Sequence, residues 1–155
     1  MRLTVYTDYA LRVLMYLAVH VEPMPTIGEI AATFRISRNH LMKVAYELGQ
    51  SGYIDTVRGK YGGLRLARPP AKIRVGEVVR TTEPDFALVP CFEPTNIPCV
   101  LSSDCRLRGA LYQAQAAFLE VLDRFTLEDL VSNRAALEGL LGRQSAAGEA
   151  SVDPA

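Results

Sequence analysis

The sequence predicts a mainly α-helical chain with a small β-hairpin wing: a winged helix-turn-helix followed by a long C-terminal dimerisation helix. Three observations predict this fold. Two short amphipathic segments are joined by a tight turn, a glycine-rich hairpin pattern follows them at once, and a heptad-like run of apolar residues begins at Arg106. The 155 residues are 49% hydrophobic and 22% charged, which is the composition of a globular chain about one domain in size.

The first element is a helix expected from Tyr6 to about Val21, because its apolar residues recur close to the 3.6-residue period. Two prolines follow and end it, since proline cannot continue the helical hydrogen bonds. Asp8 stands four residues before Arg12 in this helix. That spacing predicts an exposed ion pair of small energetic value.

Two capped amphipathic segments predict the helix-turn-helix. Thr26 and Glu29 form a capping-box pattern ahead of a short helix that ends near Phe34. A second helix is expected to start with Ser37 as its N-cap and to end at Gly52. Its buried face is predicted by four residues at helical spacing: Leu41, Val44, Ala45 and Leu48.

A β-hairpin wing is predicted by strand-like runs at residues 53–57 and 64–67, bridged by a basic, glycine-rich segment. One more short helix is expected around Val75–Val79. A helix-turn-helix followed by a hairpin is the order of a winged helix, so we assign residues 1–82 to a DNA-binding domain.

The remaining chain divides into three parts. Residues 83–105 are rich in proline and cysteine and show little periodicity, which predicts a loop. Dimerisation helices are expected over residues 106–141, with Thr126 as an internal N-cap, and a disordered tail over residues 142–155. The heptad-like seam consists of Leu107, Leu111, Ala114, Phe118, Val121 and Phe125.

Charge is distributed unevenly between the halves of the chain. Residues 1–80 hold 12 basic and 6 acidic residues, whereas residues 81–155 hold 5 and 11. The basic half favours an anionic partner such as duplex DNA, although a solvated basic surface would show the same asymmetry. The DNA-contacting candidates are Ser37, Arg38, Asn39, His40 and Lys43 on the second helix, and Arg58, Lys60, Tyr61, Gly62 and Arg65 on the hairpin.

Cys91, Cys99 and Cys105 lie within fifteen residues of one another. Their spacing differs from that of a zinc knuckle, and three thiolates leave a tetrahedral zinc one ligand short. Three thiolates can hold three corners of a 4Fe–4S cluster, but ordinary half-buried cysteines fit the spacing equally well.

The sequence has no secretory signal and no apolar run long enough to span a membrane, so a cytoplasmic protein is expected. Metalloprotease and serine-hydrolase motifs are absent from the sequence, and we expect no enzyme activity.

Several of these segments together resemble the Rrf-type winged-helix transcriptional repressors. They are the opening Thr7–Arg12, the second-helix stretch Ser37–Val44, the wing Val57–Leu66, the stretch Ile73–Arg80 and the three-cysteine loop, so that the resemblance covers residues 1–141. It implies a homodimer that binds a double-stranded operator and carries an iron–sulfur cluster, with 4Fe–4S favoured and 2Fe–2S an alternative.

Within that family the chain is most similar to the nitric-oxide-sensing repressors. A branch that regulates cluster assembly carries a histidine three residues after the last cysteine, and this chain has Arg108 there. The resemblance implies that Cys91, Cys99 and Cys105 bind the cluster, with Asp8 of the other subunit as fourth ligand. Three alternatives stay open: a regulator of cluster-assembly or thiol-stress genes, a zinc or thiol sensor without a cluster, and a cluster-bearing redox protein with no DNA role.

Overall fold

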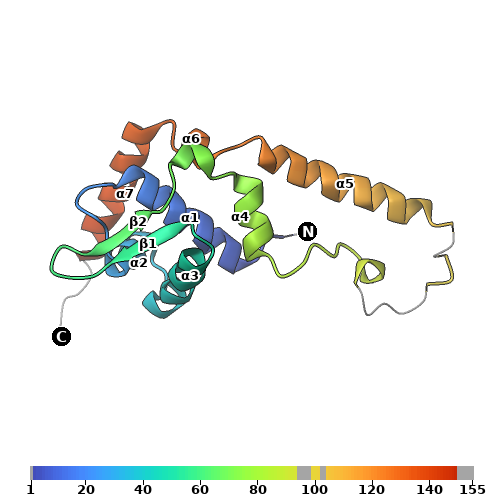
Figure 1. Ribbon diagram of the computed structural model, residues 1–155, viewed down its shortest axis with the longest axis horizontal. Coiled ribbons are helices and arrows are strands. Elements are labelled where there is room, and N and C mark those ends of the chain that lie inside the picture. Colours follow the sequence, from blue (N-terminus) through green and yellow to red (C-terminus); the bar gives the residue numbers. More distant parts are fainter. Residues whose placement is uncertain (1, 94–98, 102–103, 150–155) are drawn as a thin grey trace.

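The computed structural model describes residues 2–93, 99–101 and 104–149, and it confirms the predicted fold class (Figure 1). The winged helix comprises α1 (Val5–Val19), α2 (Ile27–Phe34), α3 (Arg38–Gln50), β1 (Ile54–Val57), β2 (Gly63–Leu66), the 3-10 turn η1 (Pro70–Lys72) and α4 (Val75–Thr82). A second 3-10 turn, η2 (Pro90–Phe92), precedes the long helix α5 (Arg106–Asp123), and α6 (Leu127–Leu130) and α7 (Arg134–Glu149) complete the order.

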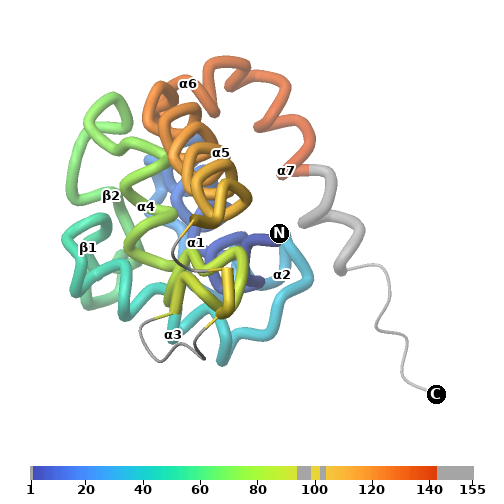
Figure 2. Tube along the Cα trace, turned by 90° about the vertical axis from the view of Figure 1, so that its right-hand side faces the viewer, coloured from blue at the N-terminus to red at the C-terminus, as the bar shows by residue number. Residues whose placement is uncertain are grey.

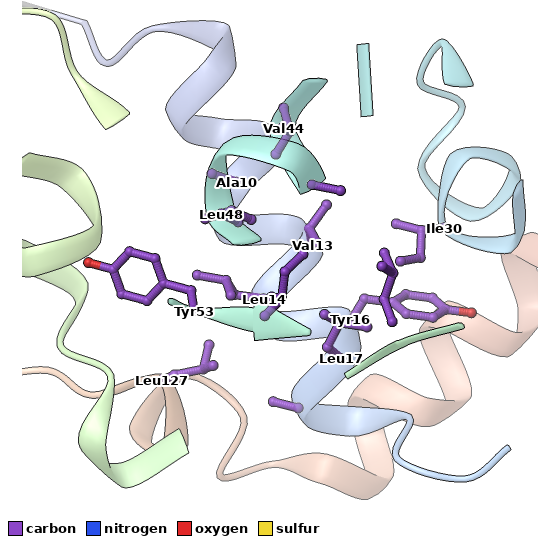
Figure 3. Packing of buried hydrophobic residues seen from close by; sticks show 14 of the residues in the cluster. Ala10, Val13, Leu14, Tyr16, Leu17, Ile30, Val44, Leu48, Tyr53 and Leu127 are labelled. Atoms are coloured by element: carbon purple, nitrogen blue, oxygen red, sulfur yellow. The ribbon is translucent and has the colours of Figure 1, made fainter. Parts of the chain in front are cut away.

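Helix α1 forms the centre of the core. Its residues Ala10, Val13, Leu14 and Leu17 are almost fully buried, and Figure 3 shows Val13 and Leu14 beside Leu48 of α3. The core draws on every part of the winged helix and also on Leu127 of α6. Burial of this apolar surface supplies the main stabilisation of the unit.

The turn between α2 and α3 is fixed by local backbone chemistry. The capping box of Thr26 and Glu29 is formed as predicted. Arg35 ends α2 in the left-handed conformation (φ 53°), and the Ile36 amide donates to the Ala31 carbonyl at 3.0 Å. The prediction for Ser37 was half right: it is the N-cap residue of α3, but its hydroxyl makes no capping hydrogen bond.

The wing is a two-stranded antiparallel sheet in which Ile54 pairs with Leu66 and Val57 with Gly63. The Leu64 amide donates to the Pro25 carbonyl at 2.8 Å, which ties the second strand to the segment before α2. A Cβ at Gly63 would stand 2.7 Å from the carbonyl oxygens of both Met24 and Pro25, so the close approach requires glycine.

Helix α5 extends away from the winged helix, and the segment from the end of α4 to η2 runs out in the same direction (Figure 1). Figure 2 looks nearly along α5 and shows it lying to one side of α1 and α4. Two backbone hydrogen bonds join its C-terminal end to the winged helix: Val75 N–H donates to the Phe125 carbonyl at 2.9 Å, and Leu127 N–H to the Ile73 carbonyl at 2.8 Å. Arg80 makes two hydrogen bonds to the Asp123 carboxylate, at 2.6 and 2.7 Å.

The C-terminal region differs from the prediction in one respect. Helix α7 continues to Glu149, so residues 142–149 are helical where the sequence predicted a disordered tail; the rest of that tail lies outside the described residues. Its start packs against the winged helix through Leu137 and Leu141. Across the described residues, no helix has the combined length and hydropathy that crossing a bilayer requires.

Candidate nucleic-acid interface and cysteine segment

Helix α3 buries one face and presents the other to solvent. Leu41, Val44, Ala45 and Leu48 are buried, as the sequence predicted. The exposed face carries Asn39, Lys43, Tyr46 and Glu47, and also Met42, which sequence reasoning missed. Met42 stands four residues before Tyr46, and residues four apart share a helix face, so this spacing could have placed Met42 on the exposed face.

The N-terminal turn of α3 concentrates donors and positive charge. Ser37, Arg38, Asn39 and His40 are all exposed there. The amides of a first helical turn and the positive end of the helix dipole favour a phosphate oxygen. Arg38 and Lys43 form no ion pair with any described residue, so their charges are available to an anionic partner.

The wing supplies a second set of candidates, not all of them equivalent. Arg58, Lys60 and Tyr61 are exposed at its tip, with the Lys60 ammonium 5.6 Å from the centre of the Tyr61 ring. Arg65, by contrast, forms an ion pair with Asp55 across the hairpin at 3.3 Å, so part of its charge is already compensated. A Cβ at Gly62 would stand 2.2 Å from the Val57 carbonyl oxygen, so the fold of the wing requires glycine here whether or not this residue contacts DNA.

A groove between α1 and α3 joins this surface to the first helix. Val5, Tyr6 and Tyr9 line one wall, and His40, Lys43, Val44 and Glu47 the other. The Tyr6 hydroxyl is shielded from solvent and has no hydrogen-bond partner among the described residues. Burial raises the pKa of Tyr6, and the nearby Glu47 carboxylate raises it further.

Asp8 lies on the partly exposed side of α1, and its carboxylate accepts a hydrogen bond from Arg12 Nε at 2.8 Å. This is the ion pair that the sequence predicted. Both side chains are about half exposed, so solvent screens the pair and its contribution to stability is small.

The three cysteines are not disulfide-bonded and differ in their surroundings. Cys91 lies in η2 and is half-buried, Cys99 is exposed, and Cys105 caps α5 by accepting the Arg108 amide proton at 3.4 Å on its sulfur. The part of the chain that the structure describes contains no cluster of three His, Cys, Asp or Glu side chains able to hold a metal. Within a single chain, therefore, the described geometry gathers neither the three cysteines nor Asp8 into one ligand group.

Contacts with α5 hold the cysteine segment in place. The Phe92 ring stacks on Tyr112 with centroids 3.9 Å apart, and the Gln115 amide donates to the Phe86 carbonyl. Arg108 lies over the same Tyr112 ring. A hydrogen bond to Tyr112 is the main cause that raises the pKa of Arg108. The Arg108 Nε atom is shielded from solvent and lacks a hydrogen-bond partner among the described residues.

Comparison with known proteins decides the family. A family model described as an iron-dependent transcriptional regulator, Rrf2, matches residues 3–133. The chain belongs to the Rrf2 family. Its Rrf2 relatives include the HTH-type transcriptional regulator NsrR of Geobacillus kaustophilus, which is 54% identical over 142 residues covering 91% of this chain and 97% of that protein. The protein of the same name from Bacillus subtilis is 51% identical, with 91% and 97% covered.

Solved structures of Rrf2 proteins have the same fold as this chain. CymR of Bacillus subtilis, described as the global cysteine regulator, superposes with a TM-score of 0.71 at 28% identity, covering 86% of this chain and 98% of that one. IscR of T. potens gives 0.67 at 22% identity, covering 100% and 94%, and supports the fold alone. The chain is therefore a DNA-binding winged-helix transcriptional repressor of the NsrR and CymR type, and not an enzyme.

Proposed function

We propose that this Rrf2 protein is a homodimeric repressor that carries an iron–sulfur cluster and releases its operator when nitric oxide reaches that cluster. The observation that carries the proposal is the set of three free cysteines, of which Cys105 is the N-cap of α5 and Cys91 adjoins Phe92, whose ring stacks on α5. About half of the chain's residues are identical to those of proteins named NsrR. Nitric oxide as the signal comes from the family resemblance that the sequence motifs carry.

The donor set fits an iron–sulfur cluster. Cysteine thiolates are the usual ligands of such clusters. Cys105 is the N-cap residue of α5, and its sulfur accepts the Arg108 amide proton, so one of the three sulfur atoms lies at a helix N-terminus. Cys99 is exposed and so accessible to an incoming metal. When bound, the cluster would supply iron that reacts with nitric oxide and exchanges ligands.

Three cysteines leave a 4Fe–4S cluster short of one protein ligand, and we assign that role to Asp8 of the second subunit. Asp8 suits the role because its side chain is half exposed and Arg12, with which it is paired, lies on the same helix. If the Asp8 carboxylate leaves Arg12 to bind the cluster, the loss of stability is small, because an exposed i,i+4 ion pair contributes only about 0.3–0.5 kcal/mol to the free energy of unfolding.

The second subunit is expected to pack along α5. None of the residues of α5 is buried within the single chain, although its seam is apolar and Leu107 is 67% exposed. A helix with such a stripe needs a partner, and a second copy supplies the same stripe by symmetry.

The chain's own contacts would carry a change from the cysteine segment to the DNA-binding surface. The Phe92–Tyr112 stack and the Gln115–Phe86 hydrogen bond couple the segment to the first ten residues of α5. At the other end, the Arg80–Asp123 hydrogen bonds couple α5 to the winged helix. The recognition helices of a dimer must match half-sites about one DNA turn apart, so a small change in their separation is enough to lose operator binding.

Purification without oxygen tests the proposal. The expected preparation is coloured, contains iron and sulfide, and shifts an operator duplex in a gel until nitric oxide is added. Cys99→Ala should lose iron and operator affinity together, whereas Lys60→Ala, as matched control, should keep its iron and bind DNA less tightly. A colourless, iron-free protein that binds the operator as tightly as the loaded one would refute the proposal.

A thiol or zinc sensor is the second candidate. The likeness to CymR and the exposed thiol of Cys99 favour it. Metal analysis of the same preparation separates the two: zinc, or no metal with DNA binding that responds to oxidants, would replace the cluster proposal.

A further inference from the structure

Helix α3 exposes two large apolar side chains in the middle of its otherwise polar face. Met42 is 53% exposed and Tyr46 is 68% exposed. They are four residues apart, and with Asn39, Lys43 and Glu47 they line one shallow hollow. Single exposed apolar residues are common on protein surfaces, but a pair at i and i+4 forms a continuous patch.

The position of this patch indicates what it contacts. It lies on the side of α3 turned away from the buried Leu41, Val44 and Leu48, so it is the part of the helix that faces an incoming ligand. Arg38 and Lys43 flank it and form no ion pair with the described residues, and one carboxylate, Glu47, stands against these two cations. Cations beside a small apolar patch fit duplex DNA better than an apolar protein surface, which would have to bury those charges.

In the major groove of DNA the C5-methyl group of thymine is the apolar feature of the base edges. Asn39 is in the first turn of α3 and has the amide that pairs with the N6 and N7 atoms of adenine. A rise of about 1.5 Å per residue puts Met42 about 4.5 Å and Tyr46 about 10 Å along the helix from Asn39, which spans neighbouring base pairs.

We propose that Met42 and Tyr46 are specificity-determining residues that contact thymine methyl groups in each operator half-site, next to an adenine read by Asn39. The inference rests on α3 being the DNA-recognition helix of the proposed repressor. It goes further by naming the base feature that this surface recognises.

Exchange of thymine for uracil tests the proposal, because it removes the methyl group alone. Duplexes with a randomised core are selected on the full-length protein purified without oxygen, and the enriched operator is resynthesised with deoxyuridine at each thymine in turn. Loss of one contacted methyl should weaken wild-type binding about fourfold, since burying such a group contributes roughly 0.8 kcal/mol. Met42→Ala and Tyr46→Ala should each abolish the effect at a different thymine.

Three further variants serve as controls. Met42→Leu keeps an apolar side chain and should keep the thymine dependence. Tyr46→Phe should also keep it, because the ring and not the hydroxyl makes the contact. Lys43→Ala should weaken the thymine and uracil operators equally. Circular dichroism checks that each variant is folded, which is expected because all three positions are exposed.

Two results would overturn the proposal. One is a uracil operator bound as tightly as the thymine operator at every position. The other is a thymine dependence that Met42→Ala and Tyr46→Ala leave unchanged. Failure of the regulatory proposal is distinguishable, because DNA binding that ignores iron or nitric oxide can still depend on the thymine methyl groups.

Discussion

Thr7 forms the buried link between the start of α1 and the end of α4. It has no exposed surface, and its hydroxyl donates to the Thr82 hydroxyl at 2.9 Å, which in turn donates to the Val78 carbonyl at 2.9 Å. Next to it, Thr4 donates both its amide and its hydroxyl to one Glu83 carboxylate oxygen, at 2.8 and 3.0 Å. The link holds in place the helix turn that carries Asp8.

Thr7→Val keeps the shape of the side chain and removes only the hydroxyl. The hydrogen bond to Thr82 is lost together with the 3.1 Å contact between the Thr7 and Thr4 hydroxyls, and the Thr82 oxygen loses a donor at a partly buried position. We expect the free energy of unfolding to fall by about 1–2 kcal/mol. Thr7→Ser keeps the donor and deletes one buried methyl group, so it should cost about 1 kcal/mol for a different reason.

Urea denaturation at one fixed protein concentration measures these changes, because the stability of a dimer depends on concentration. The double variant Thr7→Val/Thr82→Val should cost less than the sum of the two single variants, since both partners of one hydrogen bond are removed together. A Thr7→Val protein as stable as wild type, or a double variant with additive costs, would show that this hydrogen bond does not stabilise the fold.

The wing glycine, the seam of α5 and the Arg80–Asp123 pair can each be tested by substitution. Gly63→Ala should lower the free energy of unfolding by about 1–3 kcal/mol in urea titrations, because its Cβ would press on two backbone carbonyl oxygens 2.7 Å away; an unchanged midpoint contradicts this. Val121→Glu on the exposed seam of α5 should give monomers in analytical ultracentrifugation, while Ala116→Glu on another face of the helix should stay dimeric; a dimeric Val121→Glu protein excludes this interface. The Arg80 guanidinium lowers the pKa of Asp123. The pair therefore stabilises the protein fully at pH values above the ordinary carboxyl pKa of 3.8, and this stabilisation is lost as the pH falls through the lowered pKa. The stability difference between wild type and Asp123→Asn, followed by thermal melts, should therefore shrink in acid; a constant difference would mean that the ion pair is not its source.

The sequence alone determined the local features of the fold. The capping box at Thr26, the N-cap at Thr126 and the glycine just after α3 each depend on residues within one or two helical turns, so their patterns can be recognised in the chain. The apolar seam of α5 repeats along a single helix and can be recognised in the same way. The Asp8–Arg12 pair is of the same kind. Side-chain spacing on one helix fixes which residues share a face, and so the buried side of α3 was predicted correctly.

Tertiary packing decided what those residues can do. Asp55 compensates Arg65 because the hairpin register sets them opposite each other. The Ser37 hydroxyl caps no amide, although the residue stands at the N-cap position. The attachment of α5 through Arg80 and Asp123 joins residues 43 positions apart. Such pairings depend on the relative placement of whole elements, which burial of the common core determines and which no short stretch of sequence encodes.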